Sequence, residues 1–376
     1  MRIAIIGSRG YPYVYGGFET FVKELSERLV KQDVEVHIYC QKNLFKTFPQ
    51  QVNGIYLHYI PTLPQKSLNQ IIHSFLSILH ATFSKADVLL VVNLAAGPMG
   101  WIPKITGKKT IINVDGLEWL RPKWQGLGAK YFYWAAKAAT ILYDKIITDA
   151  EGMRQVYLKE FNKDSTVIAY GAPDYKKAAL NLIDRFALKE NDYYLIVGRL
   201  VPDNNADLII KGFLESQSTK KMVIVGDVPY TDKYASDLKA TQNERLIFLG
   251  YVKDQDELMA LYQNAFSYIH GHKYGGTNPA MLKAMSNHCA ILALDTIFNR
   301  EMLNNGEFGF FFEENADSVG YMLEKLESEP EKIQGLKDKV SSGLTEKYNW
   351  EKITQAYKNE MSKLLKNNRI TQVPIS

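Results

Sequence analysis

The sequence predicts an α/β protein built from two doubly wound domains, each with a parallel sheet. Short apolar runs alternate with amphipathic stretches along the chain, which is the pattern of α/β folding. The apolar runs are continuous, as expected for parallel strands covered by helices on both faces. The pattern restarts after Gly, Pro and charged residues at 171–177, and 376 residues suit two domains of roughly 150 residues or more.

The first half predicts seven strands and a helix that follows the first of them. Between the first two strands, Phe18, Phe21, Val22, Leu25 and Leu29 keep helical spacing. The expected strands are Arg2–Ile6, Glu35–Tyr39, Tyr56–Tyr59, Val88–Val92, Thr110–Val114, Lys145–Thr148 and Thr166–Ala169.

The second half predicts six strands and a final amphipathic helix. Helical spacing recurs at Leu258, Leu261 and Tyr262, and again over 350–365. We therefore expect domains at 1–175 and 176–349 with a cleft between them, and ligands beyond the carboxyl ends of the strands. The expected strands are Tyr193–Val197, Met222–Val225, Leu246–Leu249, Ser267–Ile269, Ala290–Ala293 and Phe310–Phe312.

Composition narrows the class of protein. The apolar fraction of 46% excludes intrinsic disorder, and 2 cysteines give neither a disulfide framework nor a CxxC metal knuckle. We expect a cytoplasmic protein with no signal peptide and no membrane span, because the apolar runs are short or interrupted. The net charge of +4 divides into +8 for residues 1–180 (22 bases, 14 acids) and −4 for the remainder (23 bases, 27 acids). Nucleic acid, anionic lipid or a phosphorylated substrate would suit the basic half.

A pair of glycines, Gly16 and Gly17, precedes the first expected helix. Glycines at such a place let backbone N–H groups approach an anion or a sugar, although an ordinary flexible turn explains them equally well. The GxGxxG spacing and the acidic residue of a dinucleotide site are both missing, which disfavours a nicotinamide enzyme.

Two carboxylates follow the strand that ends at Val114. Asp115 comes directly after this strand and Glu118 three residues later. Either could accept a proton or hold an acceptor hydroxyl, and a solvated turn carboxylate is the alternative.

The segment at 119–137 combines bases with aromatic rings. Lys123, Lys130 and Lys137 are seven residues apart, so a continuous helix would place them on one side. This pattern suits a membrane interface, whereas a core helix with a solvated basic side is an equal alternative, with Leu127 and Trp134 among the residues that would pack inward. Nucleic acid is disfavoured because no known recognition motif accompanies the charge. The residues assigned to a membrane or acceptor surface are Trp119, Arg121, Lys123, Trp124, Lys130 and Lys137.

Two strand ends in the second half point to an anion site. Arg199 follows one strand and can grip a phosphate with a fork of donors. Another strand leads into a glycine-rich loop, then Asn278 as a helix cap and Pro279 in the first turn, a geometry that favours a diphosphate. The alternative is a tight strand-to-helix connection. No Walker lysine follows, and His270 and His272 lack a nearby acidic partner, so we predict hydrogen bonding for them and no metal.

Five segments, in this order, resemble glycosyltransferase family 4, and most of all its bacterial rhamnosyltransferase branch. The resemblance implies the two-domain GT-B fold and a retaining reaction, and it covers nearly the whole chain. It also implies that the final helix, 350–366, packs back on the first domain. The segments are 6–10, 15–22, 115–119, 198–205 and 270–285, with Gly16-Gly17, Asp115-Gly116-Leu117-Glu118-Trp119, Gly198-Arg199 and Gly275-Gly276-Thr277-Asn278 at their centres.

The resemblance also implies site roles. Gly16 and Gly17 would border the donor sugar, Asp115 the reacting centre, and Arg199 the diphosphate. The remaining donor-binding residues would be the diphosphate loop and the residues beside the base: Asn204, His270, His272, Gly275, Gly276, Thr277, Asn278, Lys283, Tyr251 and Val252.

Two departures from the family pattern stand out. Lys283 occupies the place of a glutamate that binds the nucleotide ribose, and its partner glutamate eight residues earlier is Gly275. Asn204 stands where many relatives carry a phosphate-binding lysine. A lysine cannot accept a hydrogen bond from a ribose hydroxyl, so Lys283 either adds charge to the diphosphate site or weakens donor binding.

The resemblance therefore implies transfer of L-rhamnose from dTDP-β-L-rhamnose to a polyprenyl-pyrophosphate-linked sugar in surface polysaccharide synthesis. No metal or other cofactor is expected. The protein would lie peripherally on the inner face of the plasma membrane, and a homodimer is compatible with the family. The alternatives are a UDP-hexose donor and a non-catalytic nucleotide-sugar-binding homologue.

Overall fold

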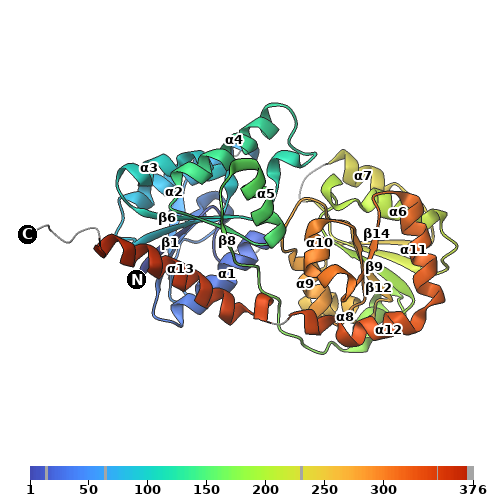
Figure 1. Ribbon diagram of the computed structural model, residues 1–376. Coiled ribbons are helices and arrows are strands. Elements are labelled where there is room, and N and C mark those ends of the chain that lie inside the picture. Colours follow the sequence, from blue (N-terminus) through green and yellow to red (C-terminus); the bar gives the residue numbers. More distant parts are fainter. Residues whose placement is uncertain (13–15, 63–65, 229–231, 345, 371–376) are drawn as a thin grey trace, which may run out of the picture. The chain divides into compact units, whose positions relative to one another are not determined.

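The computed structural model describes residues 1–12, 16–62, 66–228, 232–344 and 346–370. The chain divides into two compact units (Figure 1). Unit 1 comprises Met1–Gly171 and Lys347–Ser376, and unit 2 comprises Ala172–Glu346.

Unit 1 contains an eight-stranded sheet of order β3-β4-β2-β1-β5-β6-β7-β8. The strands are β1 (Arg2–Ile6), β2 (Glu35–Gln41), β3 (Gln51–Val52), β4 (Ile55–Ile60), β5 (Val88–Val91), β6 (Lys109–Val114), β7 (Lys145–Thr148) and β8 (Thr166–Val167). The seven predicted strands are confirmed, with small differences at their ends. The sheet is not wholly parallel, however, because the short edge strand β3 runs antiparallel to β4.

Helices cover both faces of this sheet (Figure 1). They are α1 (Gly17–Val30), α2 (Lys66–Thr82), α3 (Trp101–Ile105), α4 (Leu127–Leu142), α5 (Glu151–Phe161) and α13 (Trp350–Ile370), and the 3₁₀ segments η2 (Leu94–Gly100) and η3 (Glu118–Leu120) join them. In α1 the apolar positions that predicted the helix, among them Phe21, Val22 and Leu25, are buried, as expected for an amphipathic helix against a sheet.

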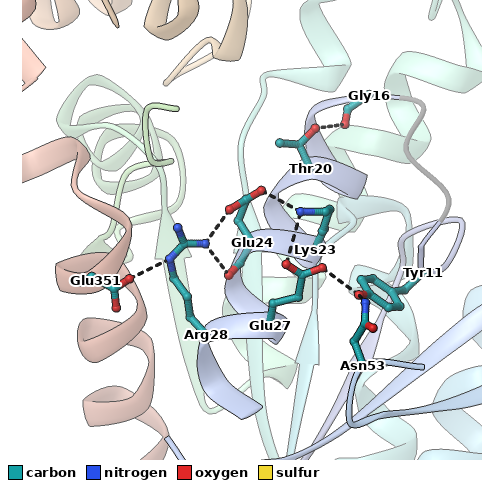
Figure 2. A network of polar contacts seen from close by, with 9 residues as sticks. All are labelled: Tyr11, Gly16, Thr20, Lys23, Glu24, Glu27, Arg28, Asn53 and Glu351. Atoms are coloured by element: carbon teal, nitrogen blue, oxygen red, sulfur yellow. Dashed lines mark hydrogen bonds and ion pairs between the residues drawn. The ribbon is translucent and has the colours of Figure 1, made fainter. Parts of the chain in front are cut away.

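The last helix of the chain belongs to unit 1. In α13 the side chains of Trp350, Tyr357 and Met361 are buried, and Arg28 Nε of α1 lies 3.1 Å from a carboxylate oxygen of Glu351 (Figure 2). The indole of Trp350 packs so closely on Gly171 that a Cβ there would lie 2.3 Å from the ring, so this contact requires glycine.

Unit 2 contains a six-stranded, all-parallel sheet of order β11-β10-β9-β12-β13-β14. All six predicted strands are confirmed: β9 (Tyr193–Val197), β10 (Lys221–Val225), β11 (Leu246–Gly250), β12 (Ser267–His270), β13 (Ile291–Leu294) and β14 (Phe310–Phe312). The helices are α6 (Ala206–Glu215), α7 (Lys233–Lys239), α8 (Gln255–Asn264), α9 (Pro279–Ser286), α10 (Ile297–Met302), α11 (Ala316–Ser328) and α12 (Pro330–Lys339). Tyr194, Ile209, Phe213 and Leu323 lie in the core between the sheet and its helices.

The strand orders locate the ligand-binding edge of each unit. In unit 2 the chain builds outward from β9 through β10 to β11, and then returns to add β12 on the other side of β9. Crevices at such a reversal lie at the carboxyl ends of the strands, so the loops after β9 and β12 are the place to seek a ligand. The same reversal occurs in unit 1 between β1 and β5.

Candidate functional site

The two loops at the reversal in unit 2 are joined by the side chain of Asn204. Its Nδ2 donates to the carbonyl oxygen of Arg199 at 2.7 Å, and its Oδ1 lies 2.8 Å from Nδ1 of His272. The backbone approach is equally tight, because a Cβ on Gly271 would lie 2.2 Å from the carbonyl oxygen of Asn204. Asn204 therefore positions the loops after β9 and β12, and both ends of its amide are already engaged.

Helix α9 begins at the end of the second loop and has the features of an anion site. Asn278 caps it, accepting from the N–H of Ala280 at 2.9 Å, and Pro279 occupies the first turn, as predicted. No acidic residue lies in this first turn, so no carboxylate of the helix's own first turn offsets its positive dipole end. One backbone donor is already used, because the N–H of Asn278 lies 3.3 Å from Sδ of Met302.

Arg199 supplies the charge at this edge. It follows β9 and its side chain is exposed, and within the described part of the chain its guanidinium has no carboxylate partner. Lys273, by contrast, lies 2.6 Å from both carboxylate oxygens of Glu314. Arg199 is therefore better placed than Lys273 to bind an incoming phosphate.

The two histidines lie at different depths. His270 ends β12 and is buried, with Nδ1 2.8 Å from the hydroxyl of Tyr268, while His272 is only partly buried. Burial, with a smaller contribution from His272, lowers the pKa of His270 well below its ordinary value, so its ring is neutral. Among the residues that the structure describes, no group of three or more His, Cys, Asp or Glu side chains is arranged to hold a metal.

The residues predicted beside the nucleotide lie around α8 and α9. Lys283 Nζ donates to Gln255 Oε1 at 3.3 Å, and burial lowers the pKa of Lys283. Tyr251 and Val252 follow β11; the tyrosine is exposed and the valine is buried. The ring of Tyr251 thus faces solvent, whereas the side chain of Val252 does not.

In unit 1, Asp115 lies at the carboxyl end of β6 inside a hydrogen-bonded chain of side chains. The Tyr170 hydroxyl is 2.9 Å from Oδ2 of Asp115 and 3.2 Å from Oδ1 of Asn113. Asn113 in turn donates from Nδ2 to the Tyr357 hydroxyl of α13 at 2.6 Å. The environment of Asp115 is therefore set by residues far apart in the sequence.

The pKa values of Asp115 and Glu118 are shifted in opposite directions. Burial raises the pKa of Asp115 to about 6, and the negative charge of Glu118 raises it further, against the lowering effects of Tyr170 and Arg121. Burial would also raise the pKa of Glu118, but the charges of Arg121 and Lys123, with hydrogen bonds from Trp124 and Arg121, lower it to about 2.

The contacts separate the roles of these two carboxylates. Oε1 of Glu118 lies 2.5 Å from Arg121, and its Oε2 lies 2.7 Å from Nε1 of Trp124 and 3.1 Å from Lys123. Glu118 therefore holds the segment after η3 in place. Asp115 has the unusual pKa and lies where a strand end opens, so it is the better candidate for proton chemistry.

Gly16 and Gly17 lie at the start of α1. The hydroxyl of Thr20 donates to the carbonyl oxygen of Gly16 at 3.2 Å (Figure 2). The buried carboxylate of Glu19 occupies the first turn and accepts from the N–H of Arg9 at 3.2 Å. Because this carboxylate already meets the positive end of the helix, α1 is a poorer diphosphate site than α9. The residues 13–15 before it lie outside the described part of the chain.

The basic and aromatic segment differs from the continuous helix considered above. Helix α4 begins only at Leu127, so Lys123 is not in one helical row with Lys130 and Lys137. Trp119 packs edge-on against Tyr133, with ring centroids 6.0 Å apart, instead of projecting as a free ring. The inward packing considered for Leu127 and Trp134 is wrong, because both side chains are exposed; Ile141, one helical heptad further on, is exposed too.

Sequence reasoning missed several residues of the unit 1 site. Asp149, buried, directly follows β7 and could have been found by the same strand-end rule that found Asp115. Asn113 is a polar residue within an apolar strand, which was also a usable signal. Tyr170 and Tyr357 carry no such signal, since only the fold brings them to Asp115.

Two family models match different parts of this chain. Residues 1–173 match a family described as a domain of unknown function, DUF1972, and residues 160–340 match the family Glycosyl transferases group 1. A Campylobacter jejuni protein named N-acetylgalactosamine-N,N'-diacetylbacillosaminyl-diphospho-undecaprenol 4-alpha-N-acetylgalactosaminyltransferase is 24% identical over 229 residues, which are 59% of this chain and 56% of that protein. The match thus spans little more than half the length of that relative.

Solved structures share the fold at low sequence identity. Anabaena HepE in complex with UDP has a TM-score of 0.76 at 16% identity, covering 96% of this chain and 100% of that one. Sucrose-phosphate synthase from Thermosynechococcus elongatus has a TM-score of 0.80 at 14% identity, covering 97% and 99%. The predicted GT-B fold is confirmed, and residues 160–340 are similar to the family Glycosyl transferases group 1.

Proposed function

We propose that this chain is a retaining glycosyltransferase that moves L-rhamnose from dTDP-β-L-rhamnose to a sugar on a polyprenyl pyrophosphate. The observation that carries the proposal is that an exposed Arg199 follows β9 and the Asn278-capped α9 follows β12, the two strands at the reversal of the sheet in unit 2. This part of the chain matches the family Glycosyl transferases group 1. Such an edge recognises a nucleoside diphosphate. The lipid-linked acceptor is supported by the Campylobacter relative, whose name specifies a diphospho-undecaprenol substrate.

The donor-side residues act by stabilising the leaving diphosphate. Arg199 and the N-terminal turn of α9 place positive charge where negative charge develops as the glycosidic bond breaks. They need no rearrangement during the reaction, because Asn204 fixes the loops after β9 and β12 and Asn278 fixes the start of the helix. No metal and no enzyme nucleophile enter this scheme.

The acceptor-side residue in this proposal is Asp115. With a pKa of about 6 its carboxylate is mostly ionised at neutral pH, and it can accept a hydrogen bond from the acceptor hydroxyl. Tyr170 orients the carboxylate by donating a hydrogen bond to Oδ2. Glu118 has a different role, because its contacts hold the segment 118–124 in place. We assign the proton of the attacking hydroxyl to the leaving phosphate, as in front-face retention.

A panel of nucleotide sugars tests the donor. A ligand that binds only the folded protein raises its melting temperature, so dTDP-rhamnose should give a larger rise than UDP-glucose or UDP-N-acetylgalactosamine at equal concentration. Thymidine alone should give little rise, because it lacks the diphosphate. A larger rise with a UDP-hexose than with dTDP-rhamnose contradicts the sugar assignment while leaving the glycosyltransferase assignment intact.

A UDP-hexose donor is the second candidate. The structurally similar HepE is known in complex with UDP-glucose, and the Campylobacter relative is named for transfer of N-acetylgalactosamine. Lys283 favours a thymidine donor over a uridine donor. A lysine offers no acceptor to the ribose, and a thymidine nucleotide loses less binding energy from this because it lacks the 2′-hydroxyl.

A further inference from the structure

Helix α4 is held in one orientation by its inner face. The hydroxyls of Tyr131 and Tyr143 donate to the carbonyl oxygens of Ala95 and Ala96 in η2, at 2.7 and 2.9 Å. A Cβ on Gly97 would lie 2.2 Å from a carbonyl oxygen of α4, so η2 and α4 are in direct backbone contact. The helix therefore cannot rotate to bury its other side.

That other side is apolar and basic. Leu127, Trp134 and Ile141 follow one another at seven-residue intervals and are 84%, 55% and 61% exposed. At about 100° per residue, these three and the exposed Lys130 and Lys137 fall within an arc of about 80° on the helix surface. A helix on the surface of a soluble protein usually buries such large apolar side chains. The exposed row therefore indicates a binding surface.

Helix α3 adds further exposed apolar side chains beside this row. It lies beside the end of α4, where Lys104 Nζ donates to the carbonyl oxygen of Ile141 at 2.7 Å. It exposes Trp101 and Ile105, both large and apolar. We call the combined surface the α3–α4 face; its residues are Trp101, Ile105, Leu127, Lys130, Trp134, Lys137 and Ile141.

The charged side chains of the α3–α4 face are all basic. Neither α3 nor α4 contains an Asp or Glu, and neither does the neighbouring α2. Within the described ranges of the chain, Lys130 and Lys137 form no ion pair, whereas Lys123 is held by Glu118 at 3.1 Å. The positive charge of α4 is therefore directed to solvent.

We propose that the α3–α4 face docks on the surface of an anionic lipid bilayer. Tryptophan and aliphatic side chains enter the headgroup boundary while lysines meet lipid phosphates, and both are present here on one rigid surface. A second copy of the chain fits less well, because a twofold contact would set lysines against lysines with no carboxylate on α2, α3 or α4 to balance them. The inference rests on the proposed function in that it brings the enzyme to a lipid-linked acceptor.

Co-sedimentation with vesicles tests the face. Wild-type protein is mixed with vesicles of phosphatidylcholine containing 30% phosphatidylglycerol and with pure phosphatidylcholine, and is compared with Trp134→Ser/Ile141→Ser. The matched control is Leu180→Ser/Ile297→Ser, which removes two exposed apolar residues from unit 2. Lys130→Gln and Lys137→Gln test the charge against Lys211→Gln, an exposed lysine of α6.

We expect wild type and both controls to bind the anionic vesicles, with at least about tenfold weaker partitioning for Trp134→Ser/Ile141→Ser and about fivefold weaker partitioning per lysine removed. Failure of wild type to bind, or equal binding by the α4 variants and wild type, overturns the proposal. So does a wild-type dimer in size-exclusion chromatography that Trp134→Ser/Ile141→Ser converts to monomer, since the face would then be an interface between copies.

A measurement of nucleotide binding to the same variants distinguishes failure of the docking face from failure of the proposed function. The melting-temperature rise with dTDP-rhamnose should be unchanged in Trp134→Ser/Ile141→Ser, which lies on the outer side of α4. Vesicle binding without any nucleotide response would contradict the proposed function and leave the docking face standing. A nucleotide response without vesicle binding would do the reverse.

Discussion

The Tyr170 hydroxyl lies 2.9 Å from a carboxylate oxygen of Asp115, and this contact joins the end of β6 to the segment that follows β8. Tyr170 is buried, and its hydroxyl also lies 3.2 Å from Asn113, which is bonded to Tyr357 of the last helix. The hydrogen-bonded chain that contains this strand-end carboxylate thus joins three distant parts of unit 1.

Replacement of Asp115 by Asn should stabilise the protein at alkaline pH. The pKa of Asp115 is about 6 in the folded state against roughly 3.9 in an unfolded chain. The folded state therefore binds the proton more tightly, and this contribution to stability is complete below about pH 4 and is lost as the pH rises through 6. We expect Asp115→Asn to gain about 2 kcal/mol in free energy of unfolding at pH 8 and little at pH 4.

Urea denaturation at the two pH values measures this gain, with the exposed Asp338→Asn as control. Transfer activity of Asp115→Asn should fall by about 10-fold or more, because a neutral amide oxygen accepts a weaker hydrogen bond from the acceptor hydroxyl than a carboxylate does. Equal stability of Asp115→Asn and wild type at pH 8 would show that the native pKa is ordinary.

Tyr170→Phe should move the acidic limb of the pH–activity profile upward. The tyrosine hydrogen bond favours the ionised carboxylate, so its loss raises the pKa of Asp115 above about 6. Activity that needs the ionised form is then lost at a higher pH. The measurement is kcat/KM from pH 5 to 9.

Glu118→Gln should move the same limb in the opposite direction. The negative charge of Glu118 raises the pKa of Asp115, and its removal leaves Arg121 free to lower it. A purely structural role for both residues predicts lower activity at every pH, with no opposite shifts. Two limbs that move together would therefore refute the assignment of that limb to Asp115.

Arg199→Gln should weaken binding of dTDP without affecting binding of thymidine. A charge-assisted bond to a diphosphate typically contributes about 1.5–3 kcal/mol, so Kd for dTDP should rise by about 10- to 100-fold. Isothermal titration measures both ligands. The paired Lys273→Gln should have a smaller effect, because Glu314 already balances that charge; a larger effect than that of Arg199→Gln would place the diphosphate elsewhere.

Lys283→Glu should change the choice between nucleotides. A glutamate at this position of α9 restores an acceptor for ribose hydroxyls, and the 2′-hydroxyl exists only in uridine nucleotides. We expect the ratio of UDP to dTDP affinity to rise by about tenfold, the value of roughly one hydrogen bond. A large gain in transfer activity with both donors would instead mark the native site as degenerate.

The strand framework was readable from the sequence because continuous apolar runs such as Val88–Val91 have few alternatives to a buried parallel strand. The edge strand β3 was not, since two residues give no periodicity. On the donor side, Asn278 and Pro279 carry local capping chemistry and were found. For Asn204 the sequence predicts a ligand role, and only the structure shows that its amide bridges Arg199 and His272.

Long-range relationships account for the remaining differences. The seven-residue spacing of Lys123, Lys130 and Lys137 suggested one helix, but α4 begins at Leu127 because Glu118 holds the preceding segment in a different conformation. Periodicity also could not decide which side of α4 is buried, because small residues such as Ala135 and Ala139 pack inward on η2 and leave Trp134 exposed. A prediction based on the spacing of large apolar residues therefore cannot identify a helix face that is buried through alanines.

The most direct test is sugar transfer by the purified protein. The assay supplies dTDP-β-L-rhamnose with a polyprenyl-pyrophosphate-linked sugar in detergent and follows the product by mass spectrometry, with Arg199→Gln and Asp115→Asn as matched variants. We predict a lipid product that is heavier by one deoxyhexose and keeps the β configuration of the donor. We also predict strongly reduced product from both variants. Transfer from a UDP-hexose but not from dTDP-rhamnose, or product in equal amount from wild type and both variants, would contradict the account.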